Sequence, residues 1–461
     1  MPEFEPVIGL EIHVQLGTRT KMFCGCELSF GEAPNSRTCP VCLGLPGSLP
    51  VTNARAIHYG LLMGLAFGCE IAAEAVFSRK NYFYPDNAKN YQISQYDKPL
   101  CEGGELGGVR LTRIHLEEDA AKLVHASASG RIHGAGASVV DYNRGGTPLA
   151  EMVTEPDIRS AEQAREWLTL LRETLRQLGV SDVDMSQGSL RCDANVSVRE
   201  AGTTELGTKT ELKNMNSFAY LEAGVKAEVA RQIALLEAGE RVMQETLHFD
   251  PRSGRLTSLR SKEEAHDYRY FPEPDLVPVA PTEEMLAAAR AELGELPMAR
   301  IERFVSLGLS PDAARTLVWR PERAAFFEAS VGEGGEAQAV ANWMERAGEV
   351  GALTPSALVA LIGMVESGAI SGDAGRRVLE LLNEEGGVPA DVVEREGLGS
   401  MGDELDAVVQ KVLDENPDAV ARIRDGNMKA IGALIGPIMR ETKGRADGGA
   451  VQALIRQKLQ L

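Results

Sequence analysis

The sequence predicts an α+β protein, with an antiparallel sheet in its first part and only helices in its last part. Up to about residue 280, polar and apolar side chains alternate with a period of two, which is typical of strands with one buried face. Few helical segments interrupt these strands, which favours hairpin pairing over a doubly wound parallel sheet. From Thr282 onward the strand patterns stop, and Ala, Glu, Leu and Gly dominate. The clearest strand patterns are Arg110–His115, Val139–Asn143, Leu190–Val198 and Lys209–Asn214.

Three helices are expected within the sheet region. One of them opens with Ser160 and Gln163, which form a capping-box pattern, and stops before Gly179. In the later region, Ser-Pro and Thr-Pro pairs mark repeated helix starts. The three helices are expected at Asn53–Gly68, Ser160–Leu178 and Ser217–Ala238.

The proline-rich stretch Phe271–Pro281 leads out of the sheet region and indicates a domain boundary. We expect a sheet domain at 1–293, a helical domain at 294–405 and a helical tail at 406–461. From Pro417 the tail carries eight Lys or Arg and four Asp or Glu, on a chain whose formal net charge is −19. Its basic, glycine-containing helix could dock on RNA phosphates, and a solvated helix face is an equal alternative.

The composition is that of an ordinary globular protein, with 461 residues, 44% hydrophobic and 25% charged. The net charge argues against a nonspecific DNA or RNA coat and against binding to an anionic membrane. The N-terminus shows no signal-peptide pattern, and no apolar run approaches the ~20 residues of a membrane span. We therefore expect a cytoplasmic protein without membrane contact. Neither the Gly-x-Gly-x-x-Gly turn nor the Gly-x4-Gly-Lys-[Ser/Thr] phosphate loop is present.

Four of the seven cysteines fall into two close pairs. Cys24 and Cys26 are followed after twelve residues by Cys39 and Cys42. Two such pairs with a loop between them fit a structural zinc site in which all four positions around the metal are filled. A redox pair at Cys39 and Cys42 is the alternative, and it would leave the first pair unexplained.

Three polar segments suggest a site for a hard cation. Glu11 and His13 share one face of a strand whose other face is apolar, and Glu117 and Glu118 follow a similar alternation. A turn containing Arg144, Gly145 and Gly146 then leads to Glu151. Carboxylates with an imidazole and no thiolate suit Mg²⁺ or Mn²⁺ that also holds nucleotide phosphates. The alternative for each segment is the wet face of an antiparallel sheet.

Two later strands carry cations between carboxylates. Arg191 and Asp193 share one strand face, and Lys209, Glu211 and Lys213 share another. Neighbouring strands of this kind suit a site for phosphate and metal, since phosphoryl transfer depends mainly on positioning and charge neutralisation.

These motifs together resemble the B subunit of the bacterial aspartyl/glutamyl-tRNA amidotransferase, and the resemblance runs nearly end to end. One departure is Ala150, where a larger aliphatic residue is expected. Besides the cysteine pairs, the motifs are Gly9–Leu16, Lys80–Asp86, Val140–Leu149, Gly188–Asn195, Glu211–Ser217 and Asp267–Pro274.

The resemblance implies a fold and a reaction. The fold would be a glutamine-synthetase-like catalytic cradle, then a helical domain and a tail that resembles a separate tRNA-binding family. ATP would phosphorylate the side-chain carboxylate of Glu on tRNA(Gln) or of Asp on tRNA(Asn), and ammonia would then displace phosphate. A separate amidase (glutaminase) subunit would release the ammonia from glutamine, and a small third subunit would brace the pair. The resemblance does not select between the two tRNA substrates.

The resemblance also implies roles for residues. Glu11, His13, Glu118 and Glu151 would hold Mg²⁺. Strand-face geometry alone, and not the resemblance, suggests further contacts with ATP or the acyl phosphate. The residues are Arg191, Asp193, Lys209 and Lys213. Two alternatives stay open: a metal-dependent ATP ligase or kinase acting on a small free carboxylate, and a noncatalytic RNA-binding scaffold.

Overall fold

The structure, a computed structural model, divides into two compact units, Met1–Pro297 and Met298–Leu461. It describes residues 3–28, 30–126, 135–213, 215–261, 268–399, 403–424, 427–442, 445–446 and 448–460. Asn214, Asp267, Lys443 and Gly444 belong to predicted segments and lie outside the described residues. The division after Pro297 lies near the predicted boundary at 293.

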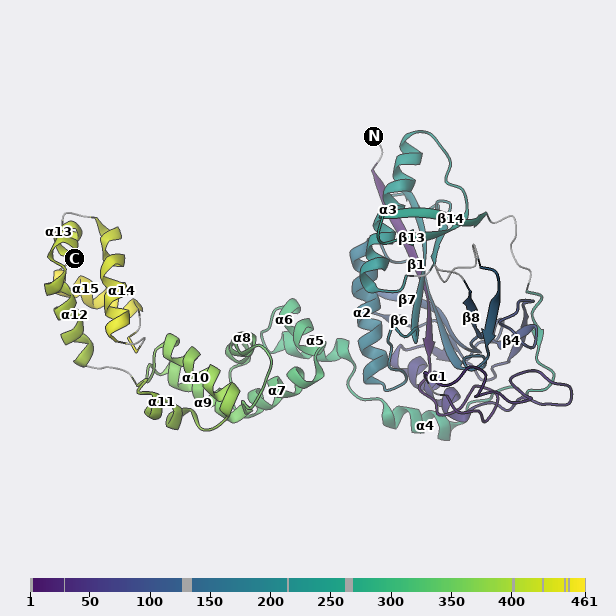
Figure 1. Cartoon of the computed structure of the whole chain (residues 1–461), viewed down its shortest axis with the longest axis horizontal. Helices are drawn as coiled ribbons and strands as arrows, with labels where there is room; N and C mark the ends of the chain where they lie inside the picture. The colour runs from purple at the N-terminus through teal and green to yellow at the C-terminus, as the bar shows by residue number, and fades with distance from the viewer. Residues whose placement is uncertain are drawn as a thin grey trace. The chain divides into compact units, whose positions relative to one another are not determined.

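A large mixed sheet forms the centre of the first unit (Figure 1). Among the described strands, β12 and β13 pair in parallel and the remaining pairs of this sheet are antiparallel. The strand order is β14-β13-β12-β11-β1-β10-β7-β5-β2, and β6 also pairs with β7. The strands are β1 (Phe4–Gln15), β2 (Glu70–Ile71), β5 (Cys101–Glu102), β6 (Glu105–Leu106), β7 (Val109–Glu118), β10 (Pro148–Thr154), β11 (Leu190–Glu200), β12 (Thr210–Lys213), β13 (Glu245–Asp250) and β14 (Arg255–Ser261).

One face of the sheet is apolar and packs on helices. In β1, Leu10, Ile12 and Val14 are buried, whereas Glu11 and His13 on the other face are partly exposed. Figure 1 shows α2 (Ala161–Gln177) and α3 (Phe218–Glu237) side by side, and α3 contacts β11. Covering the apolar face leaves the polar face of the central strands available for a ligand.

The helix ends follow the local signals in the sequence. Asn53 caps α1 (Ala54–Ala66), and the Ser160 hydroxyl accepts a hydrogen bond from the amide of Gln163 at the start of α2. Helix α4 (Glu283–Glu292) is held near α1 by Glu292, which pairs with Arg55 at 3.2 Å. The three predicted helices are therefore confirmed, each to within two residues.

Two small sheets complete the first unit. The hairpin of β3 (Ser78–Asn81) and β4 (Tyr91–Ser94) is joined by β15 (Phe271–Pro272), and β8 (Lys122–His125) pairs with β9 (Ser138–Asp141). The pairing of β15 with β3 joins segments about 190 residues apart in the chain.

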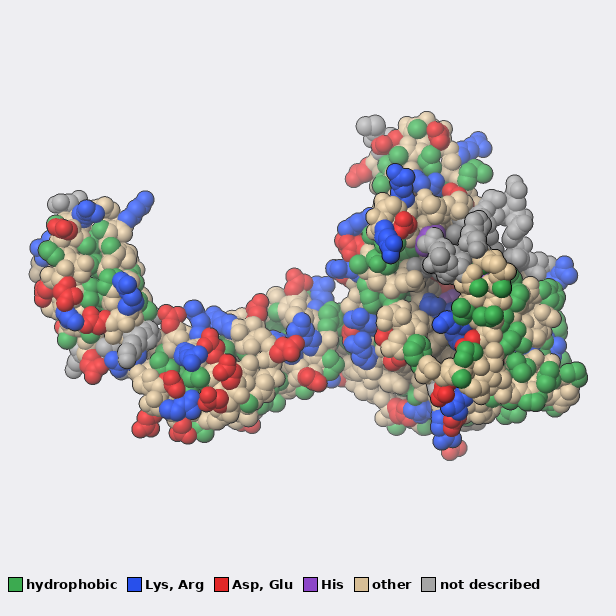
Figure 2. Space-filling view, viewed as in Figure 1, with side chains coloured by type: hydrophobic (Ala, Val, Ile, Leu, Met, Phe, Trp, Pro, Cys, Tyr) green, Lys and Arg blue, Asp and Glu red, His purple; other side chains and the backbone are tan. Residues whose placement is uncertain are grey.

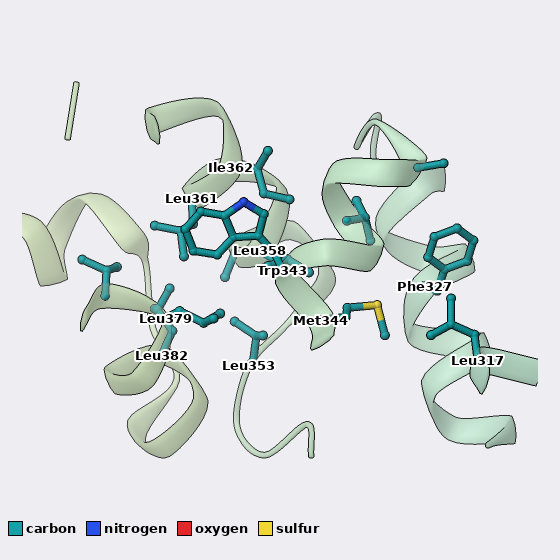
Figure 3. Close-up of a cluster of buried hydrophobic side chains, with 14 of the residues drawn as sticks. Leu317, Phe327, Trp343, Met344, Leu353, Leu358, Leu361, Ile362, Leu379 and Leu382 are labelled. Carbon is teal, nitrogen blue, oxygen red and sulfur yellow. The ribbon is translucent and has the colours of Figure 1, made fainter. Parts of the chain in front are cut away.

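The second unit is helical and holds two separate apolar clusters. Figure 3 shows the first, where Trp343 lies among leucines of neighbouring helices. The second cluster runs from Val409 to Leu459. On the face in Figure 2, acidic and basic side chains are intermixed along the helices. The helices are α5 (Pro297–Ser306), α6 (Pro311–Val318), α7 (Pro321–Gly332), α8 (Ala337–Ala347), α9 (Pro355–Glu366), α10 (Gly372–Glu385), α11 (Pro389–Glu396), α12 (Asp403–Glu415), α13 (Pro417–Arg424), the 3₁₀ helix η2 (Met428–Ala430), α14 (Ile431–Glu441) and α15 (Gly448–Leu459).

The predicted α+β class, with a large sheet followed by a helical region, is confirmed. The predicted division between 405 and 406 stays a prediction; it falls within helix α12, and Leu405 already packs against the second apolar cluster. Among the described residues, no helix combines the length and the apolar character needed to cross a bilayer.

Candidate active site

Strand register gathers acidic and imidazole side chains into one lateral row on the polar face of the sheet. His13 on β1 lies opposite Glu151 on β10 and opposite Arg191 on β11. Glu151 in turn lies opposite His115 on β7. Glu117 follows two residues after His115, so strand alternation puts it on the same face.

Glu151 is the centre of this row. Its Oε2 atom lies 3.3 Å from His13 Nε2 and 3.2 Å from His115 Nε2. Glu117 Oε1 lies 3.7 Å from His13 Nε2. Ligand atoms of Glu11, His13 and Glu151 lie within 4.8 Å of one another, as do those of His115, Glu117 and Glu151. We call these five residues the acidic row.

Arg113 Nε donates a hydrogen bond to Nδ1 of His115 at 3.3 Å. The other ring nitrogen, Nε2, faces Glu151. His115 is only 3% exposed. It is therefore suited to orient the Glu151 carboxylate.

The residues of the acidic row shift one another's pKa values. Burial raises the pKa of Glu11, and repulsion from Glu151 raises it further. Burial alone would lower the pKa of His13, but the hydrogen bond and charge of Glu151, with Glu117 and Glu11, raise it to about 9. Burial alone would raise the pKa of Glu151, yet His115 and His13 hold it well below its ordinary value. Concentrated carboxylates of this kind favour a cation among them.

The acidic row opens into a cavity of about 970 Å³. Its lining also includes the cations Lys80, Arg113, Arg191 and Lys213. Lys80 Nζ lies 3.9 Å from Glu117 Oε2, and Lys213 Nζ donates to Asp193 Oδ2 at 2.9 Å. Burial alone would lower the pKa of Lys80, but Glu117 and other neighbours raise it, so its ammonium keeps its charge.

Most of the predicted site residues meet in or beside this cavity. Arg191 and Lys213 line it, and Asp193 pairs with Lys213. Arg191 Nη2 donates to Asp119 Oδ2 at 2.6 Å. Lys209 is exposed, precedes β12 and is not among the described lining residues.

Glu118 is also separate from the acidic row. Its Oε1 accepts hydrogen bonds from Lys89 Nζ and, at 2.9 Å, from the Ile93 amide. Strand alternation explains this difference, because adjacent residues of β7 point to opposite faces. The structure therefore brings Glu117, and not Glu118, to the side of Glu151.

The sequence patterns assign no role in the site to His115 or to Lys80, although Lys80 begins one of the motifs shared with the family. The signal for His115 was present, because Arg113, His115 and Glu117 alternate with the buried Ile114 and Leu116. The place of Lys80 in the cavity depends on the pairing of β3 with β4 and β15.

The four paired cysteines do converge. The sulfur atoms of Cys24, Cys26, Cys39 and Cys42 all lie within 4.8 Å of one another. A hydrogen bond from Cys24 lowers the pKa of Cys42, and the Cys39 amide and the buried Lys21 add to this effect. Lys21 Nζ also donates to the Tyr142 carbonyl at 3.1 Å, which ties the cluster to the turn before β10.

That turn serves a structural role beside the site. Gly146 has a φ of 88° and packs on Lys21, so a side chain here would be strained. Asn143 Oδ1 accepts a hydrogen bond from the Arg37 amide at 2.8 Å, and Asp141 Oδ1 one from the Asn35 amide at 3.0 Å. These two polar side chains hold the loop between the cysteine pairs.

Comparisons with known proteins identify the family. The family model of the GatB/GatE catalytic domain matches residues 6–287 of this chain, and the family model of the GatB domain matches residues 325–459. The aspartyl/glutamyl-tRNA(Asn/Gln) amidotransferase B subunit of Anaeromyxobacter dehalogenans strain 2CP-C is 49% identical over 99% of both chains. The B subunits of Carboxydothermus hydrogenoformans and Brevibacillus brevis are 48% and 46% identical, each over 100% of this chain and 99% of their own. The chain therefore belongs to the GatB family of tRNA-dependent amidotransferase subunits.

Proposed function

We propose that this chain converts Glu on tRNA(Gln), Asp on tRNA(Asn), or both, to the amide form in an ATP-dependent ligase reaction. The observation that carries the proposal is the acidic row, which faces a cavity lined by cations. A volume of about 970 Å³ suits a nucleotide together with an amino-acid side chain. The domain is proposed to be a glutamine-synthetase-like cradle.

The donor set of the acidic row fits Mg²⁺. Carboxylate oxygens from Glu11, Glu117 and Glu151 are the ligands that this hard cation prefers, and the imidazole of His13 would complete the donor set. The raised pKa of Glu11 supports this assignment, since a bound cation would relieve repulsion between the carboxylates. Mg²⁺ would neutralise phosphate charge and polarise the γ-phosphoryl group. Glu118, the fourth predicted ligand, faces Lys89, so Glu117 replaces it in this proposal.

The residues around the row supply positioning and charge. Lys80, Arg113, Arg191 and Lys213 line the cavity and would hold phosphate oxygens of ATP and of the acyl phosphate. His115 would orient the Glu151 carboxylate through its Nε2 atom. Lys209, exposed outside the cavity, has weaker support as a phosphate contact.

The cysteine cluster is proposed to hold structural Zn²⁺. Four thiols within 4.8 Å of one another fit tetrahedral coordination, and no position would remain for a substrate. The lowered pKa of Cys42 supports metal binding, since thiolates are the ligands of zinc.

An amidase (glutaminase) subunit and a small third subunit are the proposed partners, since the relatives are named as one subunit of an amidotransferase. The tail is proposed to contact tRNA. Arg422 and Lys429 line an open hollow of about 480 Å³ in this part of the chain, and Arg445 and Lys458 are paired with acidic groups. We propose a cytoplasmic location.

The test is ATP- and Mg²⁺-dependent formation of Gln-tRNA(Gln) from Glu-tRNA(Gln), with ammonium or with glutamine and the amidase partner. Glu151→Gln should lower turnover by on the order of 100-fold or more while tRNA binding persists. Glu155→Gln is the matched control, because Glu155 accepts a hydrogen bond from Thr112 and is not among the described lining residues.

The alternatives make different predictions in the same assay. A ligase for a small free carboxylate would turn over ATP without tRNA and would tolerate deletion of the tail. An RNA-binding scaffold would bind tRNA without any ATP turnover and would be indifferent to Glu151→Gln.

A further inference from the structure

Two tyrosines from distant segments stack face to face in the lining of the cavity. The ring centroids of Tyr96 and Tyr270 lie 4.4 Å apart with an interplanar angle of 10°. Tyr270 covers one face of the Tyr96 ring, yet Tyr96 remains 55% exposed. Tyr268 packs edge-on against Tyr270 at 6.1 Å. None of the motifs that predicted the metal site accounts for this aromatic group.

The stacked pair is held in place from both segments. Gln95, which precedes Tyr96, is 1% exposed, and its Oε1 accepts hydrogen bonds from the Leu100 and Leu116 amides at 3.2 and 3.1 Å. On the other segment, Asn81 Nδ2 donates to the carbonyl of Arg269 at 2.8 Å. Both backbones are therefore fixed before a ligand arrives, which limits the entropy lost on binding.

A continuous set of contacts joins the stacked pair to the acidic row. Lys80 Nζ lies 5.2 Å from the Tyr268 ring centroid and 3.9 Å from Glu117 Oε2. One part of the cavity therefore presents a flat aromatic face, and a neighbouring part presents carboxylates and cations for phosphates. A nucleotide has the same two parts, a planar base and a charged phosphate group.

We propose that Tyr96, supported by Tyr270, is the stacking platform for an adenine base at this site. Stacking on an aromatic ring is a common way to hold a base without reading its edge. The base belongs either to ATP or to the 3′-terminal adenosine of the tRNA. This inference rests on the proposed function, because that function brings both molecules to the cavity.

The experiment compares Tyr96→Ala and Tyr96→Phe with the wild-type chain. Affinities for ATP and for inorganic tripolyphosphate, which has no base, are measured by calorimetry on the full-length chain. The KM values for ATP and Glu-tRNA(Gln) are measured on the complex with its partner subunits. Tyr84→Ala is the control, because Tyr84 is 39% exposed, contacts Tyr82 and is not among the described lining residues.

If the base is that of ATP, Tyr96→Ala weakens ATP binding by about 5- to 100-fold and leaves tripolyphosphate binding unchanged. If the base is that of the tRNA, the KM for Glu-tRNA(Gln) rises by a similar factor and ATP binding is unchanged. In either case Tyr96→Phe stays within about twofold of wild type, since the ring remains.

Changes below twofold for both substrates in Tyr96→Ala would overturn the platform. Equal losses for ATP and tripolyphosphate, or equal effects of Tyr84→Ala, would overturn it as well. Wild-type chain that binds ATP but forms no amide would refute the proposed function instead, and the binding comparison would still decide the role of Tyr96.

Discussion

The buried ion pair between Arg79 and Glu273 anchors the segment that carries Tyr268 and Tyr270. Arg79 Nε and Nη2 donate to the two carboxylate oxygens of Glu273 at 2.7 and 2.8 Å. The Glu273 side chain is fully buried, and hydrogen bonding to it raises the pKa of Arg79. Asp275 is a weaker partner, 3.4 Å from Arg79 and with its side chain 39% exposed.

Replacing Glu273 by Gln should be strongly destabilising. The amide would place an NH₂ group against guanidinium donors and leave the Arg79 charge without its buried partner. Breaking a buried ion pair lowers the free energy of unfolding by about 3–5 kcal/mol. We expect the lower end of this range, because the Arg79 side chain is 21% exposed and water can solvate its charge in the variant. The matched change Asp275→Asn should cost less than about 1 kcal/mol, because solvent screens this pair.

Thermal unfolding of the full chain measures the difference in stability between the Glu273→Gln and Asp275→Asn variants. Glu273→Gln should lower the midpoint of the first unit's transition by on the order of 5–10 °C. Hydrogen exchange should accelerate at the Glu273 amide, which donates to the Phe77 carbonyl at 2.8 Å. If both variants shift the midpoint equally, the pair does not anchor this segment.

Three further predictions concern the metals. Glu117→Gln should weaken Mg²⁺ binding by about tenfold or more, whereas Glu118→Gln should leave it within about twofold; the reverse order in calorimetry would restore Glu118 as the ligand. Mg²⁺ binding should release about one proton near pH 7, because the pKa of His13 is raised to about 9 and a metal needs the neutral imidazole. The affinity for Mg²⁺ should therefore rise about tenfold per pH unit below pH 9. Equal binding heats in buffers of different ionisation enthalpy would show that no proton is released and would contradict this prediction. Cys39→Ser should lose zinc and stability together, and normal zinc by elemental analysis would exclude the four-cysteine site.

Local chemistry explains why much of the fold could be predicted. Helix starts at Asn53 and Ser160 depend on side-chain caps a few residues away. The alternation through Glu11 and His13 identifies the wet face of β1 before any partner strand is known. Such signals need no information from distant parts of the chain.

The phase of β7 shows how strongly the choice of metal ligand depends on strand register. Glu117 and Glu118 are adjacent, so a shift of one residue exchanges the face that each occupies. The alternation of Arg113, His115 and Glu117 with apolar residues selects Glu117, yet the resemblance suggested Glu118.

Other parts of the site depend on long-range pairing. Lys80 reaches Glu117, and Tyr270 reaches Tyr96, because β3, β4 and β15 form one small sheet. No spacing within either segment encodes these contacts.

The most direct test of the proposed reaction follows an oxygen atom. Glu-tRNA(Gln) labelled with ¹⁸O in its side-chain carboxylate is incubated with the complex, ATP, Mg²⁺ and ammonium. If that carboxylate attacks the γ-phosphorus and ammonia later displaces phosphate, one labelled oxygen leaves with each inorganic phosphate. We expect one ¹⁸O per phosphate released, in amounts equal to the Gln-tRNA(Gln) formed. Unlabelled phosphate released alongside amide product would contradict phosphorylation of the side-chain carboxylate.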